Sequence, residues 1–268
     1  MDWLQALVLG LVQGLTEFLP ISSTAHLFVV PYFLGWSDPG AAFSAVIQLG
    51  TLLALFIYFA ADIRRLAIAA LAGLQHRNFN HSSDTRLAWS IVVGTVPIAA
   101  LGLGFKDFIE NEARSPFLIA CSLIALALLL ILAERRGRQH RSMQDLGFWD
   151  VQIIGLCQAL ALVPGCSRSG STIMGGLFIG LKRGDAARFS FLLGLPAIGA
   201  SGLLEFFELL DMGMGSEGLF NLGVGIGAAA LSGYLSIGFL LRFLQSHRTD
   251  PFSLYRILLG SLILFTLN

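Results

Sequence analysis

An acid, several hydroxyl groups and a histidine lie close together in an otherwise apolar part of the chain. The segment GLTEFLPISSTAH begins at Gly14 and ends at His26, inside the apolar stretch 4–34. An acid at the centre of a bilayer costs roughly 2.5–3.5 kcal/mol, so it is expected to face the protein interior and to have a partner there. We therefore interpret this segment as one half of a functional site, with Glu17 as its acid.

The neighbours of Glu17 suit the binding of an anion and the transfer of a proton. Gln13 lies one helical turn earlier on the same helix face, and His26 is a candidate general acid or base. Three hydroxyl side chains can cap the helix that follows Pro20, whose first backbone N–H groups can then bind an anion. These are Ser22, Ser23 and Thr24. The alternative is that all of these groups only cap and pack the helices.

A second cluster, GCSRSGST, begins at Gly165 and interrupts the apolar stretch 151–181. Arg168 supplies a planar guanidinium group that suits phosphate, and the glycines allow close approach of the backbone. The small and hydroxyl residues around it are Ser167, Ser169, Gly170 and Thr172. The cluster is not a P-loop, because Ser171 replaces the lysine. We interpret it as an oxyanion-binding site; the alternative is that Arg168 extends to the cytoplasmic surface.

The composition is that of a membrane protein. Hydrophobic residues make up 55% of the chain and charged residues 13%, with a mean hydropathy of +0.75, whereas soluble chains are about 25% charged. The net charge of zero argues against a nucleic-acid partner. The three cysteines have no spacing typical of a metal site or a disulfide framework. We expect a polytopic membrane protein whose residues 1–268 form one domain.

The apolar segments fall into two kinds. Six continuous segments are predicted to cross the membrane: 41–60, 87–105, 116–133, 189–207, 221–241 and 252–268. The two interrupted stretches have arms of about 12–15 residues, which reach only about 20 Å at 1.5 Å per residue. Such arms are too short to cross, and we predict that each pair forms a re-entrant helical hairpin whose non-helical tip is buried in protein.

The two halves of the chain resemble each other. The heptapeptide LGLVQGL before the first interruption matches IGLCQAL before the second. This alignment pairs Gln13 with Gln158 and places Ser22 opposite Ser167. We divide the chain into repeat 1, a linker and repeat 2, at about 1–134, about 135–150 and about 151–268.

The charges of the loops predict the orientation. Lys and Arg favour cytoplasmic loops; basic residues gather at 61–86 and 134–150, and acidic residues at 106–115 and 208–220. Each half then holds one hairpin and three spans, an odd number, so the two repeats have opposite topology and their hairpins meet near the midplane. The predicted fold is an all-α inverted-topology repeat with six transmembrane helices, two re-entrant hairpins and a cytoplasmic linker.

Together, these groups suit phosphoryl transfer from a lipid-borne phosphate to water. Arg256 is a third intramembrane charge, and either snorkelling or a functional role accounts for it. Two other functions share an anion site: a polyprenyl-phosphate transporter or flippase, for which broken helices are typical, and a non-catalytic lipid-binding protein. Only the enzyme requires a nucleophile such as Ser23 or His26 beside Arg168.

The two clusters resemble the signature segments of the undecaprenyl-diphosphate phosphatases of the bacitracin-resistance type. The resembling segments are QGLTEFLPISSTAHL, PGCSRSGST, FSAVIQLGTL, RFSFLLGLP and PFSLYRILLG. The resemblance implies an enzyme of the bacterial plasma (inner) membrane that hydrolyses undecaprenyl diphosphate to the monophosphate carrier used in cell-wall synthesis. It also implies a polyprenyl diphosphate lipid as substrate and a site that opens to the outer (periplasmic) face; monomer and homodimer are both open.

The resemblance also implies roles for individual residues. By position, the family's pair of an acid or glutamine followed by an acid falls on Gln13 and Glu17. Its serine falls on Ser23, its histidine on His26 and its arginine on Arg168. The family depends on a divalent cation, Mg²⁺ or Ca²⁺, which we expect near Glu17. The family allows Glu or Gln at the first position, and Gln13 removes one charged ligand here. Whether Ser23 or His26 is the nucleophile is open at this stage.

Overall fold

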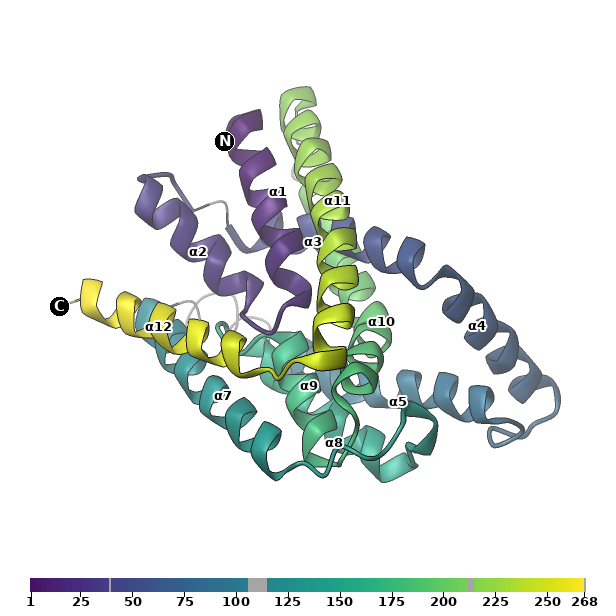
Figure 1. The fold of residues 1–268 in the computed structure, drawn as a ribbon. Coiled ribbons are helices and arrows are strands. Elements are labelled where there is room, and N and C mark those ends of the chain that lie inside the picture. Colours follow the sequence, from purple (N-terminus) through teal and green to yellow (C-terminus); the bar gives the residue numbers. More distant parts are fainter. Residues whose placement is uncertain (39, 106–114, 212–214, 268) are drawn as a thin grey trace.

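The computed structural model of the chain is built from helices, as the sequence predicts (Figure 1). It describes residues 1–38, 40–105, 115–211 and 215–267. Within these ranges the only β-structure is an isolated bridge between Arg141 and Leu181. The outer loops predicted at 106–115 and 208–220 lie largely or partly outside the described residues.

The helices follow the predicted order in both halves. The first half contains α1 (Trp3–Phe18), α2 (Ser23–Leu34), α3 (Gly40–Tyr58), α4 (Ala60–Gln75), α5 (Ser83–Gly104) and α7 (Pro116–Arg136). The second half contains α8 (Phe148–Ala159), α9 (Arg168–Phe178), α10 (Arg183–Asp211), α11 (Ser216–Ser246) and α12 (Asp250–Thr266). Short 3₁₀ turns precede and follow α8, at Met143–Asp145 and Leu160–Leu162.

Four of the described helices are long and apolar enough to cross a membrane: α5, α7, α10 and α11. A fifth crossing is obtained if α3 and α4, which meet at a bend of 82°, are taken as one broken span. The protein is therefore an all-α, multi-pass membrane protein, with four to five spans by length and composition among the described residues. The prediction of six spans is not reached by this criterion, since α12 has 17 residues.

The loop expected at 61–86 is mostly helix α4, which corrects the sequence analysis. Its Ala and Leu residues favour a helix, and so do Arg64 and Arg65. Leu66 packs into the core, whereas Ile68 and Leu71 are exposed. The segment was predicted to be a loop because of its arginines, although charges on one side of a helix at a membrane surface are common.

Two breaks interrupt helical pairs at matching places. The first break (residues 19–22) separates α1 from α2, and the second break (residues 163–167) lies before α9. Ser22 and Ser167 cap the following helices with φ angles of +76° and +62°, in the left-handed region that non-glycine residues rarely adopt. The Oγ of Ser22 accepts from the N–H of Ala25 at 3.4 Å, and that of Ser167 from Gly170 at 3.1 Å. The two aligned serines thus have the same unusual conformation.

The two halves are interleaved. Helix α1 packs on α11, and its counterpart α8 packs on α5; Figure 1 shows α1 beside α11. In the same way α3 packs on α10, and α7 on α12. A Cβ atom at Gly14 would overlap Ser232 and the backbone of α11, so this glycine allows the close approach that small residues provide between membrane helices. Each broken pair is therefore held by a helix of the other half.

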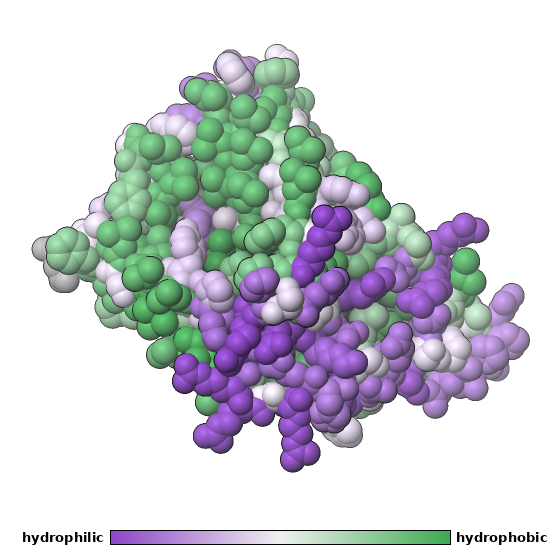
Figure 2. All heavy atoms as spheres, viewed as in Figure 1, coloured by the Kyte–Doolittle hydropathy of each residue, from purple (hydrophilic) through white to green (hydrophobic). Residues whose placement is uncertain are grey.

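Charged side chains gather at one end of the molecule. Figure 2 shows mostly hydrophilic residues over the lower part of this face and mostly hydrophobic residues over the upper part. Glu134, at the end of α7, is the centre of one group there: it pairs with Arg183 and Arg248 at 2.5 and 3.6 Å. It also accepts hydrogen bonds from the backbone N–H and the hydroxyl of Thr249. Glu134 thus joins the ends of α7 and α11 to the start of α10.

Candidate active site

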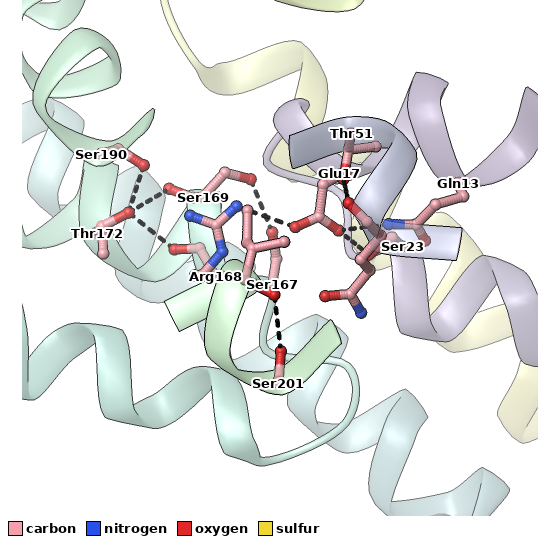
Figure 3. A network of polar contacts seen from close by, with 12 residues as sticks. Gln13, Glu17, Ser23, Thr51, Ser167, Arg168, Ser169, Thr172, Ser190 and Ser201 are labelled. Carbon is pink, nitrogen blue, oxygen red and sulfur yellow. Dashed lines mark hydrogen bonds and ion pairs between the residues drawn. The ribbon is translucent and has the colours of Figure 1, made fainter. Parts of the chain in front are cut away.

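The carboxylate of Glu17 is the centre of the site, and both of its oxygens accept hydrogen bonds (Figure 3). Oε1 accepts from Nη2 of Arg168 at 2.9 Å. Oε2 accepts from Nε2 of Gln13 at 3.0 Å and from Oγ of Ser23 at 2.6 Å. The side chains of Glu17 and Arg168 are only 6% and 9% exposed. The acid therefore has the buried partner that its cost in a bilayer requires, and this partner comes from the other half of the chain.

The sequence around the first break places these groups. Gln13 and Glu17 lie four residues apart on α1, so their side chains share one helix face. Pro20 disfavours the helical conformation of the residue before it, and Leu19 is accordingly extended, with ψ of 140°. The chain reverses within the break and starts α2 at Ser23, which brings this hydroxyl back to the carboxylate six positions earlier.

Arg168 is the first residue of α9, and its side chain lies against Gly194 of α10. A Cβ atom at Gly194 would overlap the guanidinium group. Nη1 of Arg168 is buried and has no hydrogen-bond partner among the described residues. This atom faces the backbone of α10, and the glycine at position 194 is what makes room for it. The sequence analysis did not single out Gly194, although it belongs to the resembling segment RFSFLLGLP.

The hydroxyls of the second cluster divide into two groups. Ser167 lines the cavity beside Arg168. Ser169 is fully buried and donates to the carbonyl of Leu19 in the first break at 3.1 Å. Thr172 is paired with Ser190 of α10 at 2.5 Å. Ser169 and Thr172 therefore hold the fold of the site, and neither is among the described residues that line the cavity.

The first cluster divides in the same way. Ser23 and Thr24 line the cavity, and Thr24 accepts from the backbone N–H of Gly165 at 3.4 Å, which links the two breaks. Gln13 and Ser22 are fully buried. Ser22 shares a hydrogen bond of 3.0 Å with Thr24. These buried groups position the hydroxyls that face the cavity.

His26 is held at both ring nitrogens. Nδ1 lies 2.7 Å from the carbonyl oxygen of Ser22, and Nε2 lies 2.7 Å from the hydroxyl of Tyr255. Since a carbonyl only accepts, Nδ1 carries the proton, and Nε2 of the neutral ring accepts from Tyr255. His26 is not among the described residues that line the cavity. The geometry therefore favours Ser23 over His26 as the group that meets a substrate.

A cavity of about 430 Å³ opens above these groups. Glu17, Ser23 and Arg168 form part of its wall, and helices α2, α3, α5, α7 and α10 supply most of the rest. Its apolar lining includes Phe28, Ile98, Leu103, Ile119, Leu162 and Leu204. Its polar lining includes Ser44, Gln48, Ser201 and Glu205. The cavity thus joins the charged pair of Glu17 and Arg168 to a larger apolar surface, which suits an amphipathic lipid.

The protein supplies few metal ligands at this site when no substrate is bound. The described residues contain no group of three or more His, Cys, Asp or Glu side chains that could hold a metal. The donors near Glu17 are its own carboxylate and Oε1 of Gln13, which is buried without a hydrogen-bond partner in the described part of the chain. Mg²⁺ commonly uses one or two carboxylates together with substrate phosphates. The residues present fit a cation that phosphate oxygens also hold.

Comparisons with known proteins extend the resemblance over the whole chain. The profile of the family described as "Bacitracin resistance protein BacA" matches residues 6–262. The undecaprenyl-diphosphatase of Chloroherpeton thalassium is 51% identical over 277 residues, covering 100% of this chain and 98% of the relative. That of Myxococcus xanthus is 51% identical, covering 100% and 90%, and that of Chlorobaculum tepidum is 50% identical, covering 97% and 95%. The family resemblance inferred from the motifs is confirmed.

Proposed function

Because the chain belongs to the family of the bacitracin resistance protein BacA, we propose that it is an undecaprenyl-diphosphatase. It hydrolyses undecaprenyl diphosphate to undecaprenyl phosphate and inorganic phosphate, and so returns the lipid carrier to cell-wall synthesis. One observation carries this proposal: the hydroxyl of Ser23 and the guanidinium of Arg168 meet on the carboxylate of Glu17 in the wall of a largely apolar cavity. A transporter or flippase needs the arginine but not a hydroxyl activated by an acid.

The diphosphate is bound by the guanidinium group of Arg168, which forms part of the cavity wall. The hydroxyls of Thr24 and Ser167 lie on the same wall and can donate to further oxygens. The apolar lining from α2, α5 and α10 holds the first part of the polyprenyl chain. We expect the terminal phosphorus to lie beside Oγ of Ser23 in this arrangement.

Ser23 attacks the terminal phosphorus and Glu17 takes its proton over the existing 2.6 Å hydrogen bond. The Oγ–P bond forms, the bond from phosphorus to the bridging oxygen breaks, and undecaprenyl phosphate leaves. Water then attacks the phosphoserine: a new P–O bond to the water oxygen forms, the P–Oγ bond breaks, Glu17 returns its proton to Oγ, and both protons of the water leave with inorganic phosphate as H₂PO₄⁻. His26 acts through the carbonyl of Ser22, which it fixes next to the nucleophile.

We expect a divalent cation, Mg²⁺ or Ca²⁺, to be bound together with the diphosphate. Glu17 and Oε1 of Gln13 are the protein groups that would hold it. When bound, the cation neutralises charge on the phosphate oxygens. Because Gln13 is uncharged, we expect the affinity for the cation to depend strongly on the presence of substrate.

For the topology, we propose that α3 and α12 complete six crossings and that the two broken pairs are re-entrant. The interleaved packing of the halves and the matched conformations of Ser22 and Ser167 support an inverted repeat. The cavity wall reaches Leu103 near the end of α5 and Glu205 in the last two turns of α10. Both lie next to the acidic loops, which supports a site that opens to the outer face of the inner membrane.

Single cysteines in a variant without Cys121, Cys157 and Cys166 test this orientation. We expect a cysteine at Gln144, exposed in the linker, to react with a membrane-impermeant maleimide only from the cytoplasmic side. A cysteine at Gly215, exposed at the start of α11, is expected to react only from outside. Labelling of both positions from the same side would contradict the inverted repeat.

Release of inorganic phosphate from undecaprenyl diphosphate by the purified protein tests the function itself. We expect hydrolysis with Mg²⁺ or Ca²⁺ present, and its loss when a chelator is added and recovery when the cation is restored. Protein that binds the lipid diphosphate but releases no phosphate under any of these conditions would favour the transporter or the lipid-binding protein.

A further inference from the structure

Arg256 of α12 is the largest side chain in the structure that is wholly buried. Snorkelling to the membrane surface is therefore excluded for it. Among the described residues, its guanidinium group donates only to backbone carbonyls, five in all. These belong to Pro20, Ser122, Leu123, Gly165 and Cys166.

The positions of these carbonyls connect Arg256 to the site. Pro20 belongs to the first break, and its carbonyl accepts from Nη1 at 3.2 Å. Gly165 belongs to the second break, and its carbonyl accepts from Nη2 at 2.9 Å. On the other side, Nη1 lies 3.2 Å from where a Cβ atom of Gly170 would be. The first turn of α9 therefore begins with Arg168 and has Arg256 close to it. Arg256 lies behind the residues that face the cavity.

The charge of Arg256 is not neutralised locally. Guanidinium groups stay protonated in proteins, and none of the ion pairs in the described part of the chain includes Arg256. Arg168, in contrast, shares its charge with Glu17. Buried charges are normally paired, and carbonyl dipoles supply hydrogen bonds but no net negative charge. A buried and unpaired cation next to an anion site is most stable when the anion is bound.

We propose that Arg256 is a positioning residue that attracts the diphosphate by its charge from behind the site, in addition to joining the two breaks. The inference rests on the proposed function, since it requires an anionic substrate. Occupation of the cavity by a diphosphate would supply the negative charge that the described residues do not. The two roles differ in what they need: joining the breaks requires hydrogen-bond donors, whereas attraction requires the positive charge.

Two substitutions separate these roles. Arg256→Lys keeps the charge but loses most of the donors, and Arg256→Gln keeps an amide donor but loses the charge. Both are expected to lower the melting temperature. Both variants are compared by the dissociation constant of inorganic pyrophosphate, measured by calorimetry in detergent at a fixed cation concentration. For Arg256→Lys this constant is expected to stay within about threefold of the wild-type value. For Arg256→Gln it is expected to rise about tenfold or more, which is the effect of removing one charge at roughly 10 Å from the anion at an intermediate dielectric constant.

The controls distinguish the possible failures. Arg242→Gln removes a charge from an exposed position on α11 and is expected to leave binding unchanged. If Arg256→Lys and Arg256→Gln weaken pyrophosphate binding equally at the same folded fraction, the charge of Arg256 has no such role and the inference is wrong. If the wild-type protein neither binds pyrophosphate nor releases phosphate from the lipid, it is the proposed function that fails.

Discussion

The Ser23→Ala variant is expected to release phosphate at least about 10³-fold more slowly than the wild type while staying folded, as when other enzymes lose their nucleophile. The substitution removes a single oxygen, whose only hydrogen bond as a donor runs to Glu17. Glu17→Gln keeps the shape of the side chain but removes the base, and a similar loss is expected. Because the two residues carry out one proton transfer, the double variant is expected to be scarcely slower than the poorer single variant.

For each of these variants, the turnover per folded molecule and a melting curve are measured. Ser232→Ala is the matched control, because it removes a buried hydroxyl that donates only within its own helix, to Ala228 at 2.8 Å. If Glu17 and Ser23 only cap and pack the hairpin, their variants will melt at lower temperature and keep most of their turnover. Losses that multiply, with turnover well above background, would indicate instead that His26 attacks.

The Gly194→Ala variant is expected to lose about 100-fold in activity, although it adds one methyl group outside the reacting groups. The new Cβ would occupy the place of the Arg168 guanidinium, and displacing a binding group by about 1 Å can cost this much. Arg168→Lys is expected to lose as much or more, since an ammonium group lacks the two-pronged contact with phosphate. Both variants are tested by phosphate release at several substrate concentrations.

Gly199→Ala is the control in the same helix. A Cβ atom there would meet only Leu52, at an ordinary contact distance of 3.6 Å, so its activity is expected to equal that of the wild type. Combining Gly194→Ala with Arg168→Lys gives a sharper test. If Gly194 acts only by making room for the guanidinium group, the double variant will be no slower than Arg168→Lys alone; a further 100-fold loss would contradict this role.

The sequence predicted most of the helices but not all of their geometry. All six segments expected to cross the membrane are helical, because apolar runs bounded by charged or glycine-rich segments are a strong signal. The bend of 82° between α3 and α4 has no such signal. It arises at Phe59, where α3 ends and α4 begins, and a break with neither glycine nor proline cannot be read from local sequence.

For the candidate site, the sequence singled out residues that the structure brings together, but not the directions of their side chains. The cost of an acid in a bilayer predicted that Glu17 has a partner, and the inverted topology predicted that the two clusters meet; the structure places Glu17 and Arg168 2.9 Å apart. Hydroxyls that face the cavity, such as Ser23, could not be told from those that hold the fold, such as Ser169, because both are small polar residues in the same motif. Gly194 was missed because the absence of a side chain leaves no pattern until the neighbouring helix is known.

The interleaving of the halves has a consequence for the order in which the protein is made. Arg168 is synthesised 151 residues after Glu17, and Arg256 is synthesised 236 residues after Pro20. At roughly 5–20 residues per second, the ribosome needs about 8–30 s to supply Glu17 with its arginine. During this interval the first hairpin holds a carboxylate with no cation and a glycine face on α1 with no helix to pack against, since α11 follows later still. A chain that stops before α12 therefore holds both clusters of the site but lacks Arg256, whose hydrogen bonds join the two breaks.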